Sequence, residues 1–146
     1  MELSDLYSSK IIEFAANLPI IEPLEYPMAK AHKVSRVCGS SMQVEINMKN
    51  GKVSEYSHEI SACALGQSAA FIVAKQIIGS TSEELYQLRN IMKLMIKESG
   101  EPPQGKFSEL KYLQPVHDYP ARHTSTLLIF EVVVDCLDKI EQVKNV

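Results

Sequence analysis

Several features are scarce in this sequence: it contains no tryptophan, no long apolar segment and only three cysteines. No apolar run reaches the roughly 18 residues that a membrane-spanning helix needs, so we expect no contact with a membrane. Residues 1–10 carry two acidic side chains and lack a basic n-region, which argues against a secretory signal peptide. We therefore expect a cytoplasmic protein.

Charge of one sign is not concentrated anywhere in the chain either. The formal net charge is −3, and no block of like charges appears, so we do not expect nucleic-acid binding. The cysteines are Cys38, Cys63 and Cys136, an odd number in a chain expected to be cytoplasmic. This argues against a disulfide framework and raises the question of which thiols bind or react and which are merely buried.

The length of the chain and its ordinary composition suit a single domain covering residues 1–146. A helix is predicted from about Ser4 to Asn17, because apolar side chains recur on one helical face and Ser4 can cap the helix. Pro19 ends this helix, and residues 19–28 contain three prolines, which predicts an irregular connector.

The next part of the chain has the pattern of antiparallel strands. Apolar and polar residues alternate from Met42 to Met48, which predicts a strand with one buried face. Asn50-Gly51 follows and is a strong hairpin signal, since both residues tolerate positive φ. We expect a return strand at Lys52 to Ile60 and an earlier strand around His32 to Val37.

Helical patterns follow the strands. We expect helices at Ala64 to Ile78, from near Ser80 or Thr81, around Phe107 to Leu113 and from near Pro120. Strands followed by helices indicate an α+β domain, in which about five helices cover a small three-stranded antiparallel sheet.

The three cysteines have different surroundings. Cys136 belongs to an apolar helical stripe, which predicts a buried core residue. Cys38 lies in a loop beside Gly39, where a metal or a sulfur donor can reach it. Cys63 lies at a predicted helix start, where backbone N–H groups favour an anion such as the metal-binding thiolate. For both Cys38 and Cys63, a thiol with no chemical role is the alternative.

Three segments of the chain, in order, resemble the cluster-binding segments of NifU-like (IscU-type) iron–sulfur cluster scaffolds. They are Val37–Ile46, which begins Val-Cys-Gly, Cys63–Ala70, which opens a helix of small residues, and Pro120–Leu128, which contains Pro-Ala-Arg-His. Leu6-Tyr7, Asn17 and Pro19 also resemble the family's N-terminal helix and its exit. Residues 100–120 lengthen the connection before the third segment, as in the SUF-type branch of the family.

This resemblance implies a scaffold for iron–sulfur cluster assembly, which is not an enzyme and has no catalytic residues. Such a protein receives sulfur from a cysteine desulfurase, receives iron, and transfers the nascent cluster to acceptor proteins. The implied cofactor is a transient [2Fe–2S] cluster or zinc.

The sequence departs from the family pattern at two positions. Ser40 stands where the family has an aspartate, and Ser125 stands where it has its third cysteine. The implied ligands are then Cys38 and Cys63, with His123 as the nearest imidazole. The alternative for His123 is a partly exposed histidine in the first turn of the last helix, without a ligand role. His58 is a second imidazole, for which a structural role on the sheet is favoured.

Other readings stay open because the ligand set is incomplete. One is a homodimer that shares a cluster between its chains. Another is a zinc- or thiol-dependent sulfur acceptor for a desulfurase. A third is a degenerate family member that acts as an interaction module.

Overall fold

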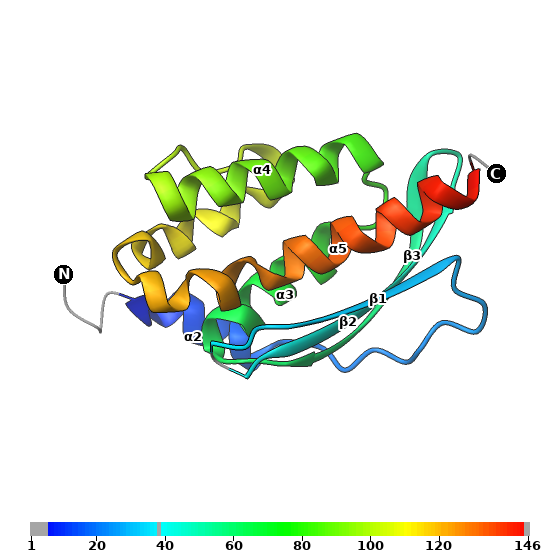
Figure 1. The fold of residues 1–146 in the computed structure, drawn as a ribbon. Coiled ribbons are helices and arrows are strands. Elements are labelled where there is room, and N and C mark those ends of the chain that lie inside the picture. The colour runs from blue at the N-terminus through cyan, green and yellow to red at the C-terminus, as the bar shows by residue number, and fades with distance from the viewer. Residues whose placement is uncertain (1–5, 38, 145–146) are drawn as a thin grey trace.

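The computed structural model describes residues 6–37 and 39–144, which form one three-stranded sheet and the helices that cover it (Figure 1). The elements are α2 (Ser9–Ala16), β1 (Ala29–Val34), β2 (Ser41–Lys49), β3 (Lys52–Ser61), α3 (Ala64–Gln76), α4 (Ser82–Glu98), the 3-10 segments η1 (Gly105–Asp118) and η2 (Pro120–Arg122), and α5 (His123–Lys144). This confirms the predicted α+β fold.

The sheet is antiparallel, as predicted, and its strand order is β1-β2-β3. Asn50 and Gly51 join β2 to β3 with φ angles of 55° and 77°, so both adopt the left-handed conformation that the hairpin requires. The alternating pattern buries one face of the sheet. Its buried side chains are Ala29, Ala31, Met42, Val44, Ile46, Val53, Tyr56 and His58.

The helices form two layers over this face. α5 packs on β1 and β2, and α3 packs between β3 and α5. α4 lies further from the sheet, against α5 and η1 (Figure 1). Cys136 on α5 is fully buried, as the apolar stripe predicted, and its Sγ atom lies 3.7 Å from the carbonyl oxygen of Val44.

The structure tests the predicted first helix only in part, and the predicted bounds of the first strand were wrong. α2 begins at Ser9, because the side chain of Ser8 caps it by accepting the N–H of Ile11 at 3.4 Å; the predicted cap, Ser4, lies outside the described residues. β1 ends at Val34 rather than Val37, because the chain turns away at Ser35.

The helix boundaries near the middle of the chain were predicted more closely. Thr81 caps α4 by accepting the N–H of Glu84 at 3.1 Å, so this helix begins where the sequence predicted. The short helix expected at 107–113 is instead the longer 3-10 segment η1. Gly79, which follows α3, has a φ of 88°, a conformation that favours glycine.

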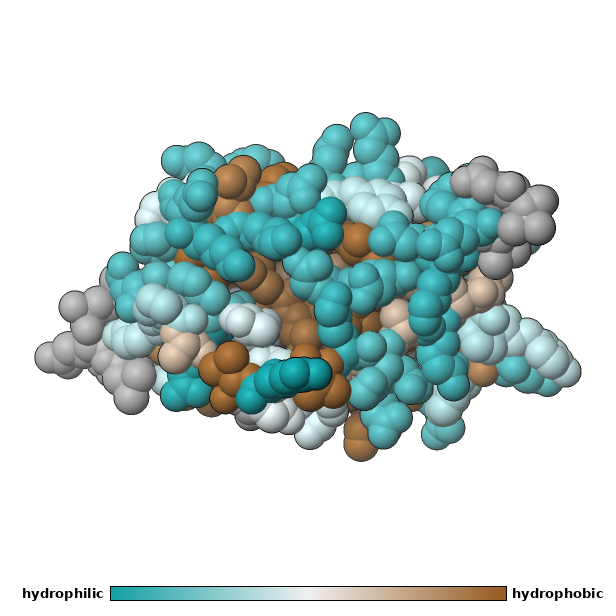
Figure 2. Space-filling view, viewed as in Figure 1, coloured by the Kyte–Doolittle hydropathy of each residue, from teal (hydrophilic) through white to brown (hydrophobic). Residues whose placement is uncertain are grey.

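Hydrophilic side chains cover most of the face shown in Figure 2, and the apolar side chains visible there form small separate areas. None of the helices in the described part of the chain is both long and apolar enough to cross a membrane.

Candidate functional site

Three segments that are distant in the sequence meet at one end of the sheet, near the left of Figure 1. The register pairs Ser41 at the start of β2 with Ser61 at the end of β3. The chain leaves β3 and enters α3 through Cys63, and α5 begins beside this point and packs on α3. The fold therefore brings the second and third family segments together.

Cys63 is the N-cap residue of α3 and is half-buried. Its Sγ atom donates a weak hydrogen bond to Oγ of Ser125 over 3.7 Å, and Ser125 in turn donates to the carbonyl of Arg122 at 3.2 Å. Ser125 is only 1% exposed. The residue at the family's third cysteine position is thus directed at the thiol of the second.

The distance between these two atoms is similar to the distance between two donor atoms that bind the same metal ion. Two sulfur atoms that bind one tetrahedral zinc ion at about 2.3 Å lie about 3.8 Å apart. The 3.7 Å between the Cys63 sulfur and the Ser125 oxygen is close to this value. The two atoms are therefore spaced as two donors to one metal ion would be, but one of them is a hydroxyl oxygen.

Gly66 allows α3 and α5 to approach this closely. A Cβ atom at position 66 would lie 3.1 Å from the carbonyl oxygen of Ser125 and 3.3 Å from Cε of Met42. These contacts are tighter than side-chain carbons normally make, so the absence of a side chain at Gly66 positions Ser125 beside Cys63. Gly66 was not among the predicted site residues.

Cys38 lies outside the described residues, but the segments on either side of it are defined. The N–H of Ser35 donates to the carbonyl of Ser40 at 2.8 Å, and the N–H of Gly39 donates to the carbonyl of Ser35 at 2.9 Å. Gly39 has a φ of 74°. This turn leads directly into β2, next to the strand end that leads to Cys63.

The imidazole of His123 contacts His117 of η1. Its Nε2 atom lies 2.9 Å from the carbonyl oxygen of His117, and the two imidazole rings stack with centroids 6.3 Å apart. It precedes Ser125 by two residues, which corresponds to about 200° around a helix. The structure therefore places Ser125, and not His123, against Cys63.

Among the described residues, no three His, Cys, Asp or Glu side chains are grouped so that they could hold a metal ion. The predicted ligand set of Cys38, Cys63 and His123 includes a residue outside that part of the chain, so it stays a prediction.

His58 has a structural role on the sheet. Burial lowers its pKa below the usual value of 6.5, although a hydrogen bond to Pro19 acts in the opposite direction. The neutral ring donates from Nε2 to the carbonyl of Pro19 over 2.9 Å and accepts at Nδ1 from the hydroxyl of Tyr56 at 3.0 Å. Both ring nitrogens are therefore engaged.

Comparisons with known proteins identify the family. A scan of family models and a search of curated proteins gave no match. Among solved structures, the N-terminal part of a nitrogen-fixing NifU-like protein from Brucella abortus is 44% identical to this chain, with a TM-score of 0.93. The match covers 96% of this chain and 97% of the Brucella chain.

A second structure comes from Fervidobacterium islandicum and is named as an iron–sulfur cluster assembly scaffold protein for the SUF system. It is 19% identical to this chain, with a TM-score of 0.83, and the match covers 93% of this chain and 99% of the Fervidobacterium chain. This shows a shared fold. Because the Brucella protein is 44% identical over nearly the whole length of both chains, this chain belongs to the NifU-like family.

Proposed function

We propose that this protein is a cytoplasmic scaffold for iron–sulfur cluster assembly, which receives sulfur and iron and passes the nascent cluster to acceptor proteins. The observation that carries this proposal is the half-buried Cys63 at the start of α3, 3.7 Å from the residue at the family's third cysteine position. The name of the Fervidobacterium protein, which has the same fold, supports it.

Sulfur would arrive as the persulfide of a cysteine desulfurase. The thiolate of Cys63 attacks the outer sulfur, the sulfur–sulfur bond of the donor breaks, and the donor's cysteine leaves as a thiolate. Cys63 then carries the persulfide. The N-terminus of α3 favours negative charge at this position, before and after the transfer.

Cys38 and Cys63 are the proposed thiolate ligands of the cluster. A [2Fe–2S] cluster is held by four ligands, and serine is a weak one at neutral pH because its hydroxyl stays protonated. A homodimer that shares one cluster would supply four thiolates from two chains. His123 could contribute only after its Nε2 atom leaves the carbonyl of His117.

Anaerobic reconstitution with iron and a desulfurase tests this proposal. We expect the wild type and a Cys136→Ala control to develop visible absorption bands, and Cys63→Ser to lose them. The control removes a thiol that is fully buried and therefore outside the site. A wild-type protein without a visible chromophore would contradict the proposal.

Metal analysis of protein purified without added metal tests the alternative of a zinc-dependent sulfur acceptor. Stoichiometric zinc would favour that alternative. We expect little zinc, because the Ser125 hydroxyl occupies a ligand position where a tight zinc site would have a thiolate.

A further inference from the structure

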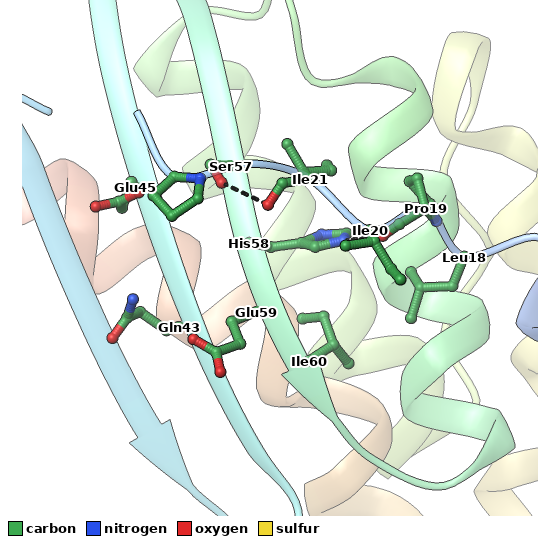
Figure 3. A pocket seen from close by; sticks show the side chains of 11 residues that line it. Leu18, Pro19, Ile20, Ile21, Gln43, Glu45, Ser57, His58, Glu59 and Ile60 are labelled. Carbon is green, nitrogen blue, oxygen red and sulfur yellow. Dashed lines mark hydrogen bonds between the residues drawn. The ribbon is translucent and has the colours of Figure 1, made fainter. Parts of the chain in front are cut away.

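A pocket of about 390 Å³ lies where the connector between α2 and β1 crosses the edge of β3 (Figure 3). The connector forms an aliphatic wall, to which Leu18, Ile20, Ile21 and Pro23 contribute. The polar lining comes from Gln43 and Glu45 of β2 and from Ser57, His58 and Glu59 of β3, and His58 lies on the face of the sheet that the helices cover. The lining comes from separate segments of the chain, so no local pattern in the sequence predicts it.

The register explains why the polar side chains meet in this pocket. Gln43 pairs with Glu59, and Glu45 pairs with Ser57, so all four lie on the sheet face opposite the helices. Ser57 donates to the carbonyl of Glu22 at 2.8 Å, which holds the connector against this face.

Two carboxylates give the pocket negative charge. Glu45 is only 5% exposed; it accepts the N–H of Leu24 at 3.0 Å, and the Nζ atom of Lys30 lies 3.9 Å from its other oxygen. Glu59 is exposed and forms no ion pair within the part of the chain that the structure describes. Glu45 thus forms an ion pair with Lys30, and Glu59 is the carboxylate that has no cationic partner among the described residues.

The rim formed by the connector, across β3 from these carboxylates in Figure 3, is apolar. Ile20 is fully exposed, at 100%, although its burial by a partner would be favourable. An arginine side chain matches this combination, because its aliphatic stem can cover apolar surface while its guanidinium binds carboxylates with two parallel hydrogen bonds. A volume of about 390 Å³ is within the range of pockets that enclose a ligand.

The pocket is close to the candidate site along the chain. Ile60 lines it and precedes Cys63 by three residues, and extended backbone rises about 3.3 Å per residue. A protein that docks here therefore brings its neighbouring residues within reach of Cys63.

We propose that this pocket binds an arginine-bearing segment of the protein that delivers sulfur to Cys63. The guanidinium lies between Glu59 and Glu45, and its stem contacts Ile20. This inference rests on the proposed function, and it adds the surface and the charge by which the donor is recognised.

Charge reversal tests the inference, with the desulfurase as the binding partner. Glu59→Lys should raise the Kd for the desulfurase about tenfold and weaken the dependence of binding on salt, since charges at such a rim control encounter. Glu55→Lys is the matched control, because Glu55 is an exposed glutamate on the same strand and face but outside the pocket. The control should change the Kd less than twofold.

A second pair of variants, one test and one control, examines the apolar rim. Ile20→Ser should weaken binding, and Ile12→Ser, on the exposed face of α2 at 56% exposure, should not. Thermal unfolding of every variant confirms that the fold is intact, and mass spectrometry of Cys63 reports the persulfide. Equal effects of Glu59→Lys and Glu55→Lys, or none from either, would overturn the inference. A wild-type chain that acquires no persulfide would instead overturn the proposed function.

Discussion

Ser125 lies against the thiol of Cys63 and is almost completely buried, so its hydroxyl occupies the position beside this thiol. Zinc and iron prefer thiolate to a protonated hydroxyl, and zinc sites in proteins have at least three protein ligands. A single side chain therefore sets how firmly this site retains a metal ion.

Ser125→Cys should convert the site into one that retains zinc. The new sulfur would lie near the 3.7 Å separation now seen between Sγ and Oγ, which suits two donors on one tetrahedral ion. We expect the metal content of the purified protein to rise to about one zinc per chain. Elemental analysis and competition with a chelator measure this.

Thr124→Cys is the control for that substitution, because it adds an exposed thiol one residue away. Equal zinc contents in the two variants would show that a side chain at position 125 does not bind the metal ion.

At the residue scale, the family segments pointed to Cys63 and Ser125, which the structure places in contact, while their role as ligands stays a prediction. The order of the family segments identified Cys63 and the serine opposite it, and the apolar stripe identified Cys136 as buried. The direction of His123 was not predictable, because the 3-10 turn at Pro120–Arg122 sets the rotation of the first turn of α5. That turn depends on tertiary packing.

At the scale of elements, the connector between α2 and β1 is held to the sheet through His58. Its neutral ring bridges the hydroxyl of Tyr56 and the carbonyl of Pro19. A second proton would have to go to Nδ1, the nitrogen that accepts from Tyr56. The neutral form therefore stabilises both this contact and the wall of the pocket.

Acid should weaken this contact. Because the pKa of His58 is lowered in the folded state, the unfolded state binds more protons as the pH falls below 6.5. The contribution of His58 to stability is thus complete above pH 6.5 and is lost below it. We expect the Tm of the wild type to fall more steeply between pH 6.5 and 5 than that of His58→Gln. Parallel Tm profiles would contradict this.

The contact between α3 and α5 makes a second prediction at this scale. Glycine to alanine in a helix normally stabilises a protein by roughly 0.5–1 kcal/mol. At Gly66 the new Cβ would press on the carbonyl of Ser125, and overpacking costs typically about 1–3 kcal/mol. We therefore expect Gly66→Ala to lower the free energy of unfolding in urea titrations. A gain in stability would show that the two helices can separate freely.

Local chemistry explains which elements the sequence predicted well. The hairpin at Asn50-Gly51 and the cap at Thr81 each depend on a few neighbouring residues. The bounds of β1 and the 3-10 form of η1 depend on distant contacts, and the predictions for them were less accurate. The pocket at the edge of β3 was not predicted at all, because it exists only after the connector crosses the strand.

On the scale of the whole molecule, the number of thiolates predicts the assembly that carries a cluster. One chain has two cysteines at family positions, and a [2Fe–2S] cluster is held by four ligands. We expect cluster-loaded protein to be a homodimer with about one iron per chain. Anaerobic size-exclusion chromatography with light scattering, combined with iron analysis, measures both. Two irons on a monomeric chain would contradict a shared cluster.

The central claim is that Cys63 holds sulfur and iron for delivery. The most direct measurement is the iron and acid-labile sulfide content, with the visible spectrum, of protein purified anaerobically from cells. The account predicts equal amounts of iron and sulfide with visible absorption bands in the wild type, and neither in Cys63→Ala. A colourless wild type, or a Cys63→Ala variant with the same iron, sulfide and spectrum, would contradict it.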